Sequence, residues 1–183
     1  MRDAIYKVSS LFISYFWGEP YNVAIGVGAL LLTWNRAFYR FGSFDFDKLE
    51  NCIATNFEKL NSFRNRYITS LSKSDDKDIS CLFKEFLEAL QIDSGKYSGR
   101  KSPVGVSKAL HLLAPSFFPI WDNRIARAYG YNYYKNPEEK YVLFCRTVRT
   151  VTNGVKDYIN YSDKTIIKLL DEYNYSKYTG GWI

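Results

Sequence analysis

The chain has 183 residues, of which 46% are hydrophobic, 18% are aromatic and 24% are charged, and its formal net charge is +6. This length and apolar content suit one globular domain with a substantial core and exclude an intrinsically disordered chain. The excess of positive charge favours a polyanionic partner, or a surface whose charge serves solubility.

The first part of the chain predicts two helices. Apolar residues recur every three or four positions from Asp3 to Phe16, which is typical of an amphipathic helix. A second helix is predicted from Pro20 to about Tyr39. Its most apolar window, residues 23–34, is too short to span a bilayer, so we expect no membrane partner. Gly26 and Gly28 within that window predict close packing against another helix.

Residues 34–40, at the end of this second helix, mix basic and aromatic side chains. Such a mixture suits a nucleic-acid-binding surface, but it also suits a last helical turn whose long basic side chains extend into solvent. A third helix is predicted from Phe46 to about Phe63, with Ser43 or Asp45 as its N-cap.

The remaining elements are also helical in pattern. A polar loop at residues 70–76 leads into an amphipathic helix whose apolar stripe runs from Ile79 to Leu90. Residues 93–101 form a flexible basic loop. A long helix is predicted from Pro137 to about Tyr158, and a last one from Asp163 to Tyr173.

The sequence predicts an all-α fold, because it contains neither sustained alternation of apolar and polar residues nor a hairpin dipeptide between apolar runs. We expect a single compact domain over residues 1–183, in which the basic loop would separate lobes at 1–93 and 94–183. The tail, residues 175–183, is either a docked aromatic segment or a frayed end.

The cysteines indicate a reducing compartment. Cys52, Cys81 and Cys145 are odd in number, far apart and without a C-x-x-C spacing, so we expect no disulfide framework, metal site or iron–sulfur cluster. A cytoplasmic location and the absence of a cofactor follow as expectations.

Positive charge is concentrated in one part of the chain. Residues 95–130 contain six basic residues and one acid, Asp122, which gives this segment a charge of +5. The six basic residues are Lys96, Arg100, Lys101, Lys108, Arg124 and Arg127.

Within that segment, Pro103 and Gly105 predict a tight turn at the start of a helix. The first turn of a helix has backbone N–H groups without partners and binds anions, and the cations Arg100, Lys101 and Lys108 around it favour a phosphate.

Lys108 and Asp122 are the candidate catalytic residues. A lysine in the first turn of a helix, close to other cations, is shifted toward the neutral amine that attacks carbon. Fourteen residues later, Asp122 opens the next helix, where it could accept a proton or stabilise a cationic sugar. Asp122 is also placed to be an ordinary N-cap, and Lys108 to be a solvated lysine.

Two short motifs resemble the helix-hairpin-helix DNA glycosylase superfamily, in particular its oxidised-guanine branch. They are P-V-G-V-S-K, from Pro103 to Lys108, and F-P-I-W-D, from Phe118 to Asp122. The resemblance implies that Lys108 forms a Schiff base and that Asp122 is the essential acid. It also implies that amides near Gly105 and Val106 contact a DNA phosphate, and that a damaged base is flipped into an aromatic-lined pocket.

Candidate residues for that base pocket are His111, Trp121, Tyr131 and Tyr133. His111 lies three positions after Lys108 on the same helical face, although a packed histidine bonded to a carbonyl is the simpler explanation. Trp121 suits the core as well as a stacking platform. The tyrosines lie in a polar turn and suit stacking on an unpaired base.

The sequence therefore predicts a monomeric DNA glycosylase with AP lyase activity, acting on double-stranded DNA that contains a damaged or modified base, without metal or cofactor. Its DNA-binding residues would be Arg100, Lys101, Gly105, Val106, Arg124 and Arg127. An alternative is a non-catalytic helical module that binds modified nucleotides or DNA through the same cleft. A third hypothesis is a helical protein-interaction or toxin-like factor with no nucleic-acid partner.

Overall fold

The computed structural model describes residues 2–158 and 164–182. Over these residues the protein is built from nine α-helices and short 3₁₀ and π segments, without a strand, and about 70% of it is helical. The prediction of an all-α fold is therefore confirmed. The α-helices are α1 (Arg2–Tyr15), α2 (Pro20–Trp34), α3 (Phe46–Thr55), α4 (Phe57–Arg64), α5 (Asp76–Ala89), α6 (Pro103–Leu113), α7 (Asn123–Ala128), α8 (Pro137–Val155) and α9 (Ile166–Asn174).

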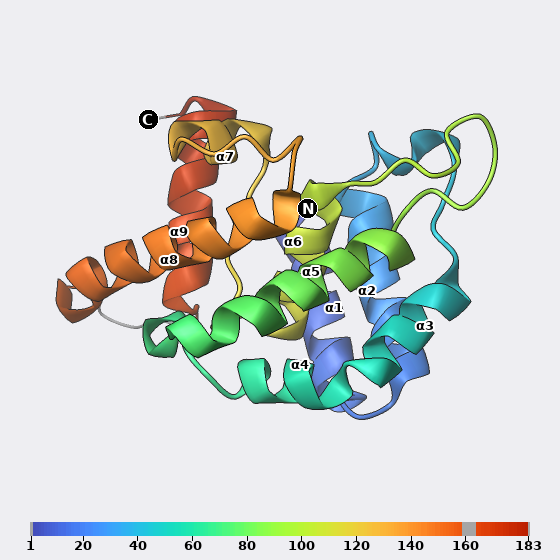
Figure 1. The fold of residues 1–183 in the computed structure, drawn as a ribbon, viewed down its shortest axis with the longest axis horizontal. Helices are drawn as coiled ribbons and strands as arrows, with labels where there is room; N and C mark the ends of the chain where they lie inside the picture. Colours follow the sequence, from blue (N-terminus) through green and yellow to red (C-terminus); the bar gives the residue numbers. More distant parts are fainter. Residues whose placement is uncertain (1, 159–163, 183) are drawn as a thin grey trace.

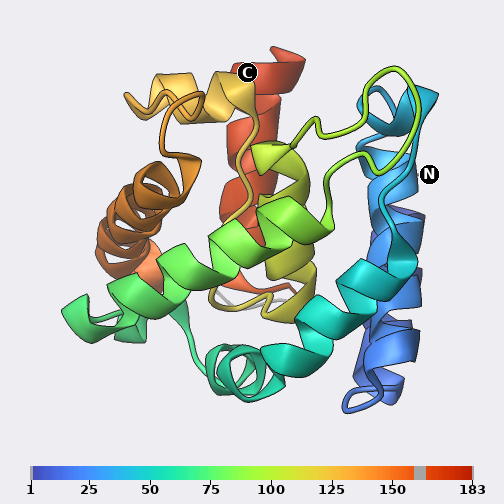
Figure 2. The same ribbon diagram turned by 45° about the vertical axis from the view of Figure 1, so that its right-hand side comes forward.

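Helix α6 is the centre of the molecule (Figures 1 and 2). Eight of its eleven residues are buried, and it packs against α1, α2 and α5. It is short and apolar on nearly every side, which is the pattern of a helix enclosed by others. The core continues from it through Phe83, Phe118 and Trp121 to Tyr141 on α8.

The two glycines of α2 pack closely, as predicted. A Cβ atom on Gly26 would lie 2.5 Å from Cγ1 of Ile13 on α1, and one on Gly28 would lie 2.5 Å from the ring of Phe46 on α3. Both distances are too short for a real carbon–carbon contact. Glycine therefore lets α1 and α3 approach α2.

Two predicted helices end earlier than expected. Helix α2 stops at Trp34, where the N–H of Asn35 closes the last turn on Leu31, and residues Tyr39–Phe41 form a separate 3₁₀ segment, η1. The predicted helix from Phe46 is broken at Asn56 into α3 and α4. Its N-cap is Asp45, whose side chain accepts from the amides of Asp47 and Lys48.

The polar stretch before α5 is more ordered than a loop. It contains the 3₁₀ segments η2 (Ile68–Ser70) and η3 (Lys73–Asp75). At the other end of the chain, α8 stops at Val155 and is followed by the 3₁₀ segment η4 (Lys156–Tyr158). The predicted start of the last helix at Asp163 lies outside the described residues, and α9 is capped by the side chain of Thr165.

The C-terminal segment is docked. Residues Tyr175–Gly180 form a π-helix, η5, that packs against α7 (Figure 1). In the part of the chain that the structure describes, no helix is both long enough and apolar enough to cross a membrane. The single domain with two lobes stays a prediction.

Candidate functional site

Two amides at the start of α6 are hydrogen-bonded to its N-cap residue, Ser102. The side chain of Ser102 accepts a hydrogen bond from the N–H of Gly105 at 3.1 Å, and its carbonyl accepts from the N–H of Val106 at 3.1 Å. Gly105 and Val106 are both buried. The phosphate contact that the resemblance implies for these two amides is thus not available in this structure, because both donors already have partners within the fold.

A serine joins the starts of α6 and α7. The hydroxyl of Ser107 lies 3.2 Å from the carbonyl of Trp121 and 3.3 Å from its N–H, and the indole N–H of Trp121 donates to the carbonyl of Pro103 at 3.1 Å. These groups are buried, so their hydrogen bonds fix the position of one helix start against the other. Lys108 and Asp122 are the next residues after Ser107 and Trp121, so the fold brings their backbones close together.

The side chain of Asp122 is held within the fold. Its Oδ1 atom accepts from the N–H of Ile125 at 2.8 Å, so Asp122 is the N-cap of α7, which was one of its two predicted roles. Its Oδ2 atom accepts from the hydroxyl of Thr179 in η5 at 2.6 Å. The neighbouring Arg124 donates to the carbonyl of Thr179 at 2.8 Å, and both Arg124 and Arg127 are exposed.

The amine of Lys108 points to a different neighbour. Its Nζ atom donates to the carbonyl of Trp34 at 2.9 Å, at the C-terminal end of α2. A cation is favourable there, because the last carbonyls of a helix carry partial negative charge. Burial raises the pKa of Asp171 on α9, and the charge of Lys108 is one of the smaller effects that oppose this rise.

A buried ionic cluster lies beside Lys108. The amine of Lys168, a residue that is only 7% exposed, is 3.0 Å from the carboxylate of Asp171. It also lies over two aromatic faces, 5.0 Å from the ring centre of Tyr6 and 5.4 Å from that of Trp34. Burial raises the pKa of Asp171, and the nearby Lys168 opposes that effect. We call these four residues, with His111, the Lys168 cluster.

His111 is a packed histidine, the simpler of its two predicted roles. Its Nδ1 atom is 2.8 Å from the carbonyl of Phe118 and its Nε2 atom is 3.1 Å from the hydroxyl of Tyr6. A carbonyl can only accept, so Nδ1 carries the proton and Nε2 accepts from Tyr6. Burial lowers the pKa of His111 to about 4, so the ring is neutral at physiological pH. It presents no surface to a base.

The other predicted pocket residues also pack inward. Trp121 is fully buried against Phe83, Tyr141 and Phe144. Tyr133 is half-buried on Trp121, at 5.3 Å between ring centres. The hydroxyl of Tyr131 lies 2.6 Å from that of Thr147 on α8. These side chains therefore belong to the framework and line no open base pocket in this structure.

Elsewhere, η1 lies beside the loop at residues 93–101 (Figures 1 and 2). Basic and aromatic side chains from the two segments meet there. The rings of Phe41 and Tyr97 lie 5.5 Å apart. The guanidinium of Arg40 is 4.8 Å from the centre of the Phe41 ring, and that of Arg100 is 5.0 Å from the Tyr97 ring. The amine of Lys96 lies 5.8 Å from the same ring. We call these five residues the η1–loop surface.

The loop that carries this surface is held by its backbone. The N–H of Asp93 donates to the carbonyl of Ser43, that of Ile92 to the carbonyl of Arg100, and that of Gly99 to the carbonyl of Ile92, all within 2.9 Å. A Cβ atom on Gly42 would lie 2.6 Å from Cγ2 of Ile92, so glycine allows η1 to approach the loop. The loop is thus better ordered than its composition predicts. Lys101, at its end, pairs with Glu88 on α5.

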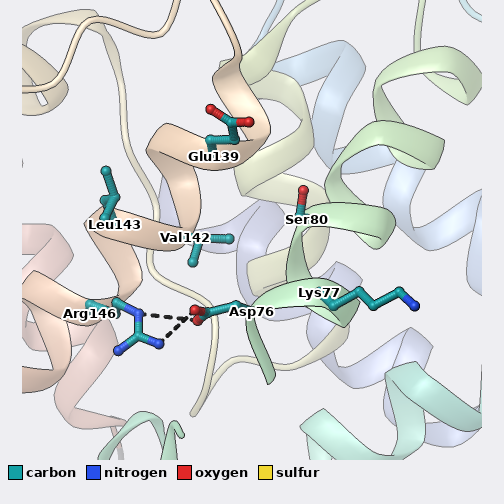
Figure 3. Close-up of a pocket in the computed structure, with 7 residues that line it drawn as sticks. All are labelled: Asp76, Lys77, Ser80, Glu139, Val142, Leu143 and Arg146. Atoms are coloured by element: carbon teal, nitrogen blue, oxygen red, sulfur yellow. Dashed lines mark hydrogen bonds and ion pairs between the residues drawn. The ribbon is translucent and has the colours of Figure 1, made fainter. Parts of the chain in front are cut away.

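A separate hollow of about 340 Å³ lies between α5 and α8 (Figure 3). Four charged residues line it, and two of them, Asp76 and Arg146, form a two-pronged ion pair with distances of 3.1 and 2.6 Å. Val142 and Leu143 supply its apolar wall. None of the predicted site residues lines it, and its two acids and two bases leave it without a net charge.

The comparisons with known protein families, curated proteins and solved structures found no match. The candidate site therefore depends on geometry alone. That geometry joins Lys108 to the Lys168 cluster and Asp122 to η5, and it assembles the η1–loop surface from two segments that the sequence analysis treated separately.

Proposed function

We propose that this protein binds DNA through the η1–loop surface, as a helical module whose function is recognition. The observation that carries the proposal is the meeting of the exposed residues Arg40, Phe41, Lys96 and Arg100 around the half-buried ring of Tyr97. Clustered cations attract the phosphate backbone, and aromatic side chains among them provide faces on which bases stack.

The charge around this surface is favourable for a polyanion. Arg40, Lys96 and Arg100 are exposed, and no acidic side chain is paired with them in the contacts that the structure describes. The nearest acid in sequence, Asp93, is 2.5 Å from the amine of Lys48, so its charge is balanced locally. The surface therefore keeps its positive charge, in agreement with the net charge of +6.

The binding test compares two triple variants with the same change in charge. Arg40→Ala/Lys96→Ala/Arg100→Ala removes the cations of the proposed surface, whereas Lys73→Ala/Lys135→Ala/Lys156→Ala removes three exposed lysines from other elements. We expect the first variant to bind a fluorescent 20-mer about tenfold or more weakly at low salt, and the second to bind nearly as well as wild type. Equal losses would show that only overall charge matters.

A second candidate function is the glycosylase and AP lyase activity that the resemblance implies. The Ser107–Trp121 hydrogen bonds favour it, because they bring the backbones of Lys108 and Asp122 together. The side-chain contacts favour recognition instead: both oxygens of Asp122 accept hydrogen bonds from the fold, and the Lys108 amine donates to Trp34. Catalysis would require these contacts to open.

Borohydride trapping on duplexes with single lesions separates the two functions. A lysine that attacks C1′ is captured as a covalent protein–DNA adduct. From the closed contacts of Asp122 and Lys108 we expect no adduct with wild type. An adduct that is lost in Lys108→Gln but kept in Lys101→Gln would establish the lyase and replace the recognition proposal.

A further inference from the structure

We infer that the η1–loop surface binds an unpaired nucleotide, with its base on the Phe41–Tyr97 ring pair and its flanking phosphates at Arg40, Lys96 and Arg100. This inference rests on the proposed function and specifies its ligand: single-stranded nucleic acid, in preference to a closed duplex.

Exposure of Phe41, beside the half-buried ring of Tyr97, is the first argument. Phe41 is 57% exposed, although Phe44 and Tyr39 next to it are buried in the core. A phenylalanine that stays in water at the tip of η1 adds little to the core. In a duplex the faces of the bases are covered by their neighbours, so an exposed ring can stack only on a base that is unpaired or has left the helix.

The position of the cations is the second argument. The guanidinium of Arg40 lies 4.8 Å over the Phe41 ring, and that of Arg100 lies 5.0 Å over the Tyr97 ring. Planar guanidinium groups stack on bases as aromatic rings do, and they also bind phosphates with two hydrogen bonds. A nucleotide stacked on either ring would therefore have a cation close enough to contact its phosphate.

Rigidity is the third argument. The loop is closed by the Ile92–Arg100 and Gly99–Ile92 backbone hydrogen bonds, and Lys48 ties Asp93 to α3. Gly95 and Gly99 have φ values of +81° and +80°, which glycine adopts without strain. A platform that is already ordered loses little conformational entropy on binding, so stacking on it contributes more to affinity.

The experiment measures the binding of fluorescent oligonucleotides to the full chain by anisotropy, at fixed low salt. The probes are a thymidine 20-mer, a blunt duplex of mixed sequence and a uridine 20-mer. The variants are Phe41→Ala, Phe41→Trp and, as a matched control, Tyr67→Ala, which removes an aromatic side chain that is 65% exposed elsewhere. Thermal unfolding confirms that each variant is folded.

We expect wild type to prefer the thymidine strand to the duplex. Phe41→Ala should weaken binding of that strand about tenfold and leave duplex binding unchanged, because one stacked base is lost. Phe41→Trp should retain or strengthen it, and Tyr67→Ala should have no effect. The uridine strand separates RNA from DNA as the ligand. Equal affinity for both strands would mean that the surface does not distinguish ribose from deoxyribose, and a difference would identify the preferred nucleic acid.

Two outcomes overturn this inference and separate it from the proposed function. If Phe41→Ala binds every probe as wild type does, while the triple charge variant loses affinity, then DNA binding stands and base stacking is wrong. If wild type binds none of the probes at low salt, both are wrong.

Discussion

The ammonium group of Lys168 lies between two acids, Asp171 at 3.0 Å and Glu172 at 3.8 Å, and two aromatic rings, and this arrangement explains how α9 is attached. The side chain of Asp171 is 12% exposed, so its charge is largely removed from water and is compensated mainly by Lys168, with a smaller contribution from Lys108. Removing one partner of a buried ion pair leaves the other charge uncompensated, which is more costly than removing both.

We therefore predict that Lys168→Ala lowers the free energy of unfolding by about 3 kcal/mol at neutral pH. Burial raises the folded-state pKa of Asp171 above its unfolded value, so the ionised carboxylate lowers the free energy of unfolding once pH exceeds the unfolded pKa. Without Lys168 this loss of stability is larger. The deficit should shrink as pH falls and Asp171 becomes protonated in the folded variant. Urea unfolding of both proteins across this range measures it.

The control for this prediction is Lys135→Ala, which removes an exposed lysine. It should change the free energy of unfolding by less than about 0.5 kcal/mol across the same pH range. A deficit in Lys168→Ala that stayed constant with pH would point to lost packing on Tyr6 and Trp34, and not to the charge of Asp171.

At the scale of single residues, the sequence predicted local interactions and missed distant ones. The cap formed by Asp122 and the packed, carbonyl-bonded His111 were among the predicted roles, because each follows from neighbours within a few positions. The pairing of Lys108 with the end of α2 joins residues 74 positions apart. The one local signal for the Lys168 cluster was a lysine among apolar residues with an acid three positions later.

At the scale of elements, the approach of α1 to α2 depends on a missing side chain. A Cβ atom on Gly26 would overlap Ile13, which is fully buried and has no space to move into. We predict that Gly26→Ala lowers the free energy of unfolding by about 1 to 3 kcal/mol, although alanine favours a helix more than glycine does.

Gly154→Ala is the matched control. Gly154 is also within a helix, α8, but is exposed, and a Cβ atom there has no neighbour within 4 Å. Without a clash only the helix propensity changes, so this variant should be more stable by about 0.5 to 1 kcal/mol. Thermal or urea unfolding gives both values. If both substitutions stabilised the protein, α1 and α2 would be able to move apart enough to accommodate the added methyl group, which would contradict the prediction.

Helix content was predictable from the spacing of apolar residues, whereas several helix ends were not. The break at Asn56 is an example: the apolar stripe continues through it, but the side chain of Asn56 contacts the carbonyl of Cys52 and the carboxylate of Glu85 on α5. A tertiary contact thus helps to fix the boundary between α3 and α4. Similarly, α2 ends where Asn35 reaches the hydroxyl of Ser102 at 3.0 Å.

At the scale of the whole molecule, the fold joins two segments whose roles were ambiguous in the sequence. Residues 34–40 suited either a nucleic-acid surface or a helix end, and the basic loop at 93–101 was predicted to be flexible. Their meeting could not be predicted from spacing, because about fifty residues and three helices separate them. Together they provide the cations and rings of the η1–loop surface.

The central claim is that DNA binds at this surface and not at the starts of α6 and α7. Hydrogen–deuterium exchange of the full chain, with and without a thymidine 20-mer, tests it most directly. We predict that DNA slows exchange in peptides that cover residues 36–44 and 93–101, and leaves residues 120–130 unchanged. Protection confined to residues 102–130, with none at η1 or the loop, would contradict the account.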